Sequence, residues 1–173
     1  SMSPPEFARE RLGWWDEPSA GQVIPGPRWA ACVTEGAIAG AVALFVDIAL
    51  DRSQSVVAVC GADADGIPQV ELAEMSPGTD RVTDRVSEIV GRNEVLAVGA
   101  RSAGPVASLL PELDGVCKQA GTDFVKVGSG DFAGMCGGFF DAVYAHGVRH
   151  RNDPRIDAAL TAAKRHQVVD AWT

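Results

Sequence analysis

The chain has 173 residues, 46% of them hydrophobic, which is typical of one folded domain with a substantial core and disfavours intrinsic disorder. No apolar run reaches the roughly 18 to 20 residues of a membrane-spanning helix, and the N-terminus lacks the pattern of a secretion signal, so we expect a cytoplasmic protein that does not contact a membrane. The formal net charge of −8 repels a polyanion at long range, and it therefore disfavours a nucleic-acid partner unless basic residues cluster or metal ions intervene.

Residues 1–40 are expected to form a helix and a tether ahead of the main domain, which we place at residues 41–173. Proline at its start and charges that match helix polarity predict a short helix over residues 4–12. The segment that follows contains too much glycine, proline and serine for a regular element, yet it includes Trp14 and Trp15. Two such large aromatic residues indicate a segment that packs on a surface, either of this domain or of a domain that precedes it.

Three strands are predicted next, in the order of an antiparallel meander. An apolar segment over residues 41–48 predicts a buried first strand that delivers one acid, Asp47. Residues 55–61 and 67–74 predict the second and third strands, and the polar residues 63–66 between them predict a hairpin turn.

Asp47 has two interpretations when this segment is considered alone. A buried acid at the end of a strand needs a partner, a proton or a metal ion, which makes Asp47 a candidate metal ligand. Aspartate is also a common turn former, so Asp47 could instead stabilise the turn that leads to Arg52 and Ser53.

After the meander, helical patterns alternate with short apolar strands. Strands are expected over residues 94–99 and 124–127. Helices are expected from Thr79 or Asp80 as cap to Val90 with Gly91 ending it, from Gly104 and Pro105 through Val116, from Ser129 or Asp131 as cap through Tyr144, and from Pro154 through Ala163.

This order of elements predicts an α/β fold of the ribonuclease H-like type. We expect a mixed sheet in which a three-strand meander is followed by alternating helices and parallel strands, with helices on both faces. In such a sheet Asp47 and Gly99 end neighbouring strands and should lie within about 10 Å of each other.

The cysteines and histidines do not indicate a metal site. Four cysteines lack paired short spacing, so neither a zinc site nor a disulfide framework is expected. The histidines His146, His150 and His166 have no ligand-like spacing, and we expect them at the surface or at helix ends.

Several short motifs are spread over most of the chain, and their order and spacing are specific although no single motif is. They are residues 6–13 with Trp15, 45–47 with 51–53, 104–113, 131–133 with 139–143, His150 with Pro154, 157–159 and 170–172. In this order they resemble the C-terminal nuclease domain of the large terminase subunit of tailed phages, particularly phages of actinobacteria. The resemblance implies a metal-dependent endonuclease that cuts concatemeric double-stranded DNA during packaging in the host cell cytoplasm. It also implies Mg²⁺ or Mn²⁺ as cofactor, and the terminase ATPase domain, the small terminase subunit and the portal as partners.

The resemblance makes Asp47 the first-strand metal ligand and a catalytic residue. Two hard cations about 3.5 to 4 Å apart need carboxylate ligands from several elements. Where the family has a second acid, at the end of the fourth strand, this chain has Gly99, and the third acid is expected beyond Thr173, so the domain is expected to continue past that residue. Asp170 and Glu94 are candidate substitutes, and Asp170 is included as a candidate metal ligand.

Four arginines are candidate phosphate contacts, with solvated surface charges as the alternative for each: Arg52, Arg101, Arg149 and Arg151. The missing acids leave a second function open, in which the chain is a catalytically inactive ribonuclease H-like module that docks on the packaging motor or guides DNA. A junction resolvase with the same fold is disfavoured, because such enzymes usually keep acids on several elements.

Overall fold

The structure, a computed structural model, describes residues 22–165, 167–168 and 171–172. The helix expected over residues 4–12, both N-terminal tryptophans and Asp170 lie outside these residues. The described elements, in chain order, are α2 (Gly26–Ala30), β1 (Ala39–Ile48), β2 (Gln54–Ala62), β3 (Pro68–Pro77), α3 (Val82–Arg92), β4 (Val95–Arg101), the 3₁₀ helix η1 (Pro105–Leu109), α4 (Leu110–Ala120), β5 (Asp123–Val127), α5 (Ser129–Tyr144), β6 (Arg149–His150), α6 (Pro154–Ala162), β7 (Gln167–Val168) and β8 (Ala171–Trp172).

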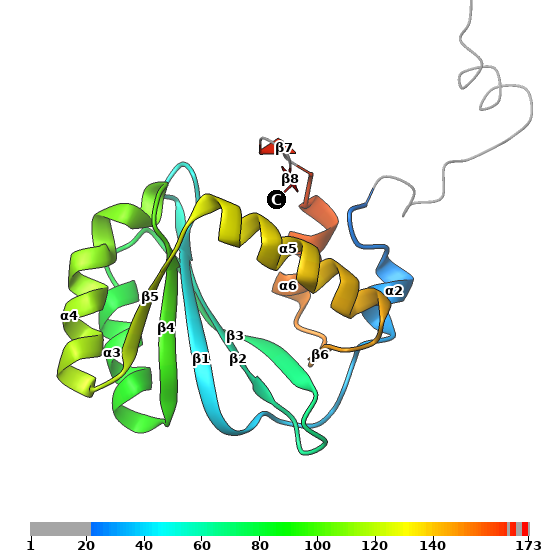
Figure 1. Ribbon diagram of the computed structural model, residues 1–173, viewed down its shortest axis with the longest axis horizontal. Coiled ribbons are helices and arrows are strands. Elements are labelled where there is room, and N and C mark those ends of the chain that lie inside the picture. The colour runs from blue at the N-terminus through cyan, green and yellow to red at the C-terminus, as the bar shows by residue number, and fades with distance from the viewer. Residues whose placement is uncertain (1–21, 166, 169–170, 173) are drawn as a thin grey trace, which may run out of the picture.

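Six strands form one mixed sheet in the order β5-β4-β1-β2-β3-β6. The first three strands pair antiparallel as a meander, whereas β4 runs parallel to β1 and β5 runs parallel to β4. Figure 1 shows α3 and α4 on one side of this sheet and α5, with α6 and α2, on the other. The predicted ribonuclease H-like arrangement, with helices on both faces, is confirmed.

The alternation along β1 decides which side chains meet which helices. Leu44, Val46 and Ile48 are buried in the core that the sheet shares with α3, η1 and α4. Because successive side chains of a strand point to opposite faces, Phe45 and Asp47 face α5. The acid of β1 is therefore on the face that α5 only partly covers (Figure 1).

A second core joins α2 to α5 and α6. Trp29 of α2 is buried beside Cys32 and Val143, and its indole Nε1 donates a hydrogen bond of 2.8 Å to Asp157 Oδ1. The glycine and proline content of this segment had excluded a regular element, but α2 begins at Gly26 with Pro27 in its first turn, where the missing N–H of proline is tolerated. The division of the chain at residue 40 stays a prediction, although residues on both sides of it are buried in this core.

His150 is fully buried, so its expected place at the surface is wrong. The imidazole stacks on the Trp29 indole with ring centroids 3.6 Å apart. The backbone N–H of Asn152 donates to Nδ1, and so the proton resides on Nε2, which donates a hydrogen bond of 2.8 Å to the Trp29 carbonyl. Flanking arginines made this segment resemble an exposed loop, whereas it adds a short edge strand, β6, to β3.

Helix ends differ from expectation at several positions. No side chain caps α3 or α5, so the expected caps at residues 79–80 and at Ser129 or Asp131 are wrong. Helix α3 continues past Gly91, and η1 occupies the turn before α4. The expected and observed ends of α3 differ by only one or two residues, a difference that sequence patterns resolve poorly.

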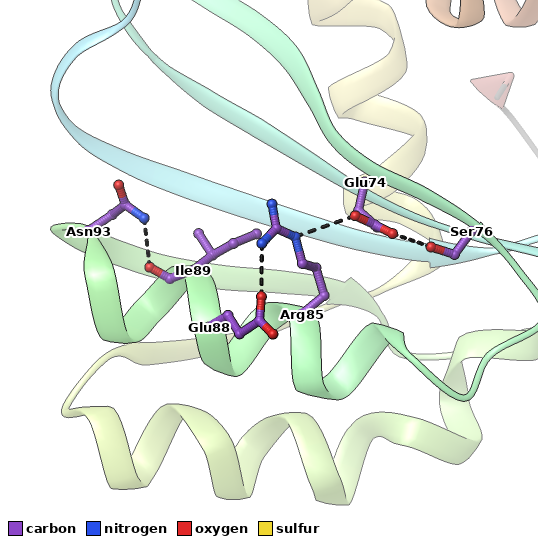
Figure 2. Close-up of polar contacts among 6 residues, drawn as sticks. All are labelled: Glu74, Ser76, Arg85, Glu88, Ile89 and Asn93. Carbon is purple, nitrogen blue, oxygen red and sulfur yellow. Dashed lines mark hydrogen bonds and ion pairs between the residues drawn. The ribbon is translucent and has the colours of Figure 1, made fainter.

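One polar contact links α3 to the sheet (Figure 2). Arg85 of α3 lies with its Nε 3.4 Å from Glu74 of β3 and pairs with Glu88 one turn later at 3.0 Å. Ser76 donates a hydrogen bond to the same Glu74 carboxylate, and Asn93 closes the helix by donating to the Ile89 carbonyl. The contact orients α3 across the face opposite to Asp47.

Asp153 caps α6, and its removal should destabilise the fold in a pH-dependent way. Its Oδ1 accepts a hydrogen bond of 2.8 Å from the Arg155 backbone N–H. The hydrogen bond from the Arg155 side chain lowers the pKa of Asp153, so the cap stabilises the fold above the unfolded pKa of about 3.9 and loses this effect as the pH falls through the lowered folded pKa. We expect Asp153→Ala to cost about 1 kcal/mol at pH 7 and less below about pH 4.

Urea unfolding followed by circular dichroism at pH 7 and pH 3 measures this difference. Asp114→Ala is the matched control, because among the described residues Asp114 forms an ion pair with Lys118 alone, an exposed lysine one turn later in α4, and its removal should cost no more than about 0.5 kcal/mol. Equal losses for the two variants at pH 7 would contradict the capping role of Asp153.

Candidate active site

Asp47 lies at the end of β1, in the middle of the sheet. It pairs with Val56 of β2, and its carboxylate accepts a hydrogen bond of 2.9 Å from the backbone N–H of Ile48. The turn that follows is held by a different acid, Asp51, whose carboxylate accepts a hydrogen bond from Ser53 N–H, and the hydrogen bonds of Ser53 lower the pKa of Asp51. The turn role considered for Asp47 is therefore carried by Asp51.

The register between β1 and β4 places a basic residue beside Asp47. Phe45 pairs with Gly99 and Val46 pairs with Ala100, and continuing this parallel register by one residue sets Arg101 next to Asp47. The prediction that Asp47 and Gly99 lie on neighbouring strands at one end of the sheet is confirmed, at a Cα separation of roughly 8 Å by strand geometry. However, β4 continues two residues past Gly99, so Gly99 does not end the strand.

Gly99 has little room for a side chain. A Cβ atom at this position would lie 3.0 Å from Cδ2 of Phe45, closer than real Cβ contacts normally come. Phe45 in turn stacks on Phe132 of α5, with ring centroids 6.2 Å apart. A side chain at position 99 would require the Phe45 ring to shift by a few tenths of an ångström, whereas position 101 is directly beside Asp47 in the strand register.

The Arg101 side chain lies across the same aromatic pair. Its guanidinium carbon is 4.8 Å from the centre of the Phe132 ring, which places Arg101 on the α5 face together with Asp47. Within the described part of the chain, the Arg101 guanidinium forms no hydrogen bond or ion pair. Its N–H donors are thus available to an anion at this edge of the sheet.

Arg52, in the turn after β1, is partly occupied. Its Nη1 donates hydrogen bonds to the Pro105 carbonyl at 2.7 Å and to Ser108 Oγ at 3.2 Å. These bonds connect the β1–β2 turn to η1, which follows β4. The C-terminal edge of the parallel strands therefore gathers Asp47, Arg101 and Arg52.

Arg149 and Arg151 lie elsewhere. Strand β6 pairs with the beginning of β3, at the far edge of the sheet and toward the end opposite to Asp47. Arg149 donates a hydrogen bond to the His146 carbonyl, and Arg151 lines a separate hollow of about 490 Å³ beside α6. The structure does not bring these two arginines together with Asp47, and their contact with DNA stays a prediction.

Further acids near Asp47 are few among the described residues. Glu94 precedes β4 and accepts, through its carbonyl, a hydrogen bond from Val42, so it lies at the opposite end of β4 from Arg101. Asp170 is outside the described residues. Within residues 22–165, 167–168 and 171–172, no group of three or more histidine, cysteine, aspartate or glutamate side chains could hold a metal ion.

Comparisons with solved structures place this geometry in a known fold. The large terminase of bacteriophage HK97 superimposes with a TM-score of 0.69 at 12% identity, over 87% of this chain and 38% of that one. The large terminase nuclease of thermophilic phage G20c, with bound magnesium, gives a TM-score of 0.51 at 15% identity, over 75% of this chain and 68% of that one. This chain has the fold of a large-terminase nuclease domain. Neither a protein-family model nor a curated protein matches the sequence.

The terminase nuclease fold is thus established at the level of architecture, and the resemblance inferred from the motifs is confirmed to that extent. The chain spans 38% of the length of the HK97 terminase. At these identities the comparison carries no information about individual side chains, so the chemistry of the site rests on the residues described above.

The described residues do not fit a two-metal centre. Such a centre needs carboxylates from at least three elements, whereas β1 supplies Asp47 and β4 supplies Arg101. A further acid, Asp131, lies at this edge of the sheet, although the sequence pattern indicates it only as a helix cap. Asp131 is exposed in the first turn of α5, directly after β5, whose Val127 pairs with Arg101, and it forms no capping hydrogen bond. The register of β4 and β5, which the sequence pattern does not determine, is the signal that brings Asp131 to this edge.

Proposed function

We propose that this chain is the endonuclease domain of a phage DNA-packaging terminase, acting on double-stranded DNA. The observation that carries the proposal is Asp47, the acid that ends the central strand of a terminase nuclease fold on the face left partly open by α5. In this proposal concatemeric DNA is the substrate, and the partners are the terminase ATPase domain, the small terminase subunit and the portal. The host cell cytoplasm is the proposed location.

Asp47 is the proposed ligand for Mg²⁺ or Mn²⁺, because carboxylate oxygens are the ligands that these hard cations prefer. The proposal is supported by the G20c terminase nuclease, which shares the fold and contains magnesium. Asp170 remains a proposed further ligand. Since the described residues supply too few acids, completion of the site requires residues outside them, and no catalytic step is assigned to the metal.

Magnesium should bind weakly to this chain. Mg²⁺ held mainly by Asp47 keeps most of its water shell, so we expect a dissociation constant on the order of 1 mM or weaker. Isothermal titration calorimetry with the native chain and Asp47→Asn tests this value. Tight, stoichiometric binding that survives Asp47→Asn would show that another group of acids holds the ion.

Cleavage of supercoiled plasmid tests the proposed function. A chain that also carries the native residues following Thr173 should nick plasmid DNA in millimolar Mn²⁺, and Asp47→Ala should abolish the nicking. Asp51→Ala is the matched control, because this neighbouring acid is engaged in the turn. Nicking that is unaffected by Asp47→Ala would overturn the assignment of Asp47.

A second candidate function is favoured by β4. Gly99 is closed in by Phe45, and Arg101, a fixed cation, stands where a second carboxylate would meet Asp47. These residues suit a catalytically inactive module that holds or guides DNA through its phosphates. For this candidate, the longer chain does not nick DNA, and Arg101→Ala weakens DNA binding and lowers the slope of its salt dependence by about 1.

A further inference from the structure

An apolar groove lies on the same face of the sheet as Asp47. It has a volume of about 360 Å³ and runs between α5, α6 and the first described residues of the chain. Phe45 of β1 and Phe132 of α5 line one part, and Val23 and Ile24 line another. Met135, also in its wall, is 53% exposed, so this part of the groove is open to solvent.

The described part of the chain begins at the wall of this groove. Residues 1–21 lead directly into Val23 and Ile24, which are part of the groove wall. The segment contains Trp14 and Trp15, two of the four tryptophans in the chain. A groove of this volume matches the pockets that enclose rigid aromatic groups.

Length and charge agree with this occupant. Trp15 precedes Val23 by eight residues, which can span up to about 26 Å, whereas the seven-residue step along α5 from Phe132 to Phe139 rises by only about 10 Å. Asp16 and Glu17 directly follow Trp15, and Lys164 lines the groove. Docked tryptophans would thus bring two acids toward a basic side chain.

We propose that Trp14 and Trp15 dock in the groove between α5 and α6, so that the segment ahead of the fold is fixed against the α5 face beside Phe45. Phe45, which lines the groove, is two residues from Asp47, and the groove therefore adjoins the candidate active site. The inference concerns the fold and holds whether or not the domain cuts DNA.

A native thiol in the groove allows a direct test. Cys136 of α5 lines the groove, whereas Cys60 of β2 is exposed elsewhere, and Cys32 and Cys117 are buried. In full-length Gly13→Cys, mild oxidation should form the 13–136 disulfide at least about 10-fold faster than the 13–60 disulfide, because docking raises the local concentration of the two thiols. Burial raises the pKa of both Cys136 and Cys60, so an alkaline buffer serves both thiols alike.

The matched control is Gly13→Cys combined with Trp14→Ser and Trp15→Ser, which keeps the tether and removes the aromatic side chains. The preference for Cys136 should disappear in this control. Peptide mass spectrometry identifies each disulfide, and mixing isotope-labelled with unlabelled chains separates links within one chain from links between chains. Circular dichroism verifies that every variant is folded.

Three outcomes overturn the proposal. An unchanged preference in the control would mean that the tether alone brings residue 13 to Cys136. A 13–136 disulfide that forms only between labelled and unlabelled chains would make a second copy the occupant of the groove. Absence of any preference in Gly13→Cys would equally contradict docking.

Discussion

Arg101→Asp, in a chain extended past Thr173 with its native residues, should raise Mn²⁺-dependent nicking of supercoiled plasmid by ~100-fold or more over either change alone. Without these two changes the chain should cut slowly or not at all. Adding one carboxylate still leaves the other expected position empty, and so neither the substitution nor the extension alone should restore full cutting.

The register of the sheet explains why position 101 is the better choice on β4. An aspartate there replaces a cation beside Asp47 with a second ligand. The sequence alone indicates Gly99→Asp, but a Cβ atom at Gly99 would lie 3.0 Å from Phe45, and Gly99 is two residue pairs away from Asp47 along the strand. We therefore expect Gly99→Asp to restore less cutting than Arg101→Asp in the extended chain.

Arg101→Asn is the matched control, because it removes the positive charge without adding a ligand. A loss of electrostatic repulsion toward the metal would affect both variants, whereas ligation affects only Arg101→Asp. Asp47→Ala in the extended Arg101→Asp chain should return nicking to background. If Arg101→Asn cuts as fast as Arg101→Asp, the ligand account is wrong.

Trp29→Ala should lower the free energy of unfolding by about 3 to 5 kcal/mol. Trp29 is 5% exposed and contacts His150 and Phe139 through its ring. Its removal leaves a cavity between α2 and α5 and deprives Asp157 of the indole hydrogen bond. The cost should therefore be among the largest for a single substitution in this fold.

Urea unfolding followed by circular dichroism measures the effect without relying on tryptophan fluorescence. Trp29→Phe keeps most of the ring and loses the hydrogen bond, so we expect a smaller cost of about 1 to 2 kcal/mol. Leu50→Ala, at a residue that is 90% exposed, should change stability by less than about 0.5 kcal/mol. A cost below about 1 kcal/mol for Trp29→Ala would show that α2 is not part of the folded core.

The architecture could be predicted from sequence because its signals are local. The apolar run of β1, the polar turn between β2 and β3, and the alternation of helical and strand patterns each depend on neighbouring residues. Pro154 likewise marked the start of α6 correctly, because its lost N–H is harmless in a first helical turn.

The features that sequence missed depend on distant contacts. Helix α2 and strand β6 are short, and each is stabilised by the stacking of Trp29 on His150, which are 121 residues apart in the chain. The candidate site likewise depends on contacts between distant parts of the chain. Asp47 was predicted from its strand, but the placement of Arg101 beside it depends on the pairing register, which the sequence of one strand does not contain.

Paramagnetic broadening by Mn²⁺ in amide NMR spectra tests the central claim most directly, since it detects weak binding at residue resolution. We predict that substoichiometric Mn²⁺ first broadens the signals around Asp47, Ala100 and Asp131, at the C-terminal edge of β1, β4 and β5, and that Asp47→Ala removes this broadening. Broadening that starts at the opposite end of the sheet, around Glu71 and Asp153, or that persists in Asp47→Ala, would contradict a metal-binding site at Asp47.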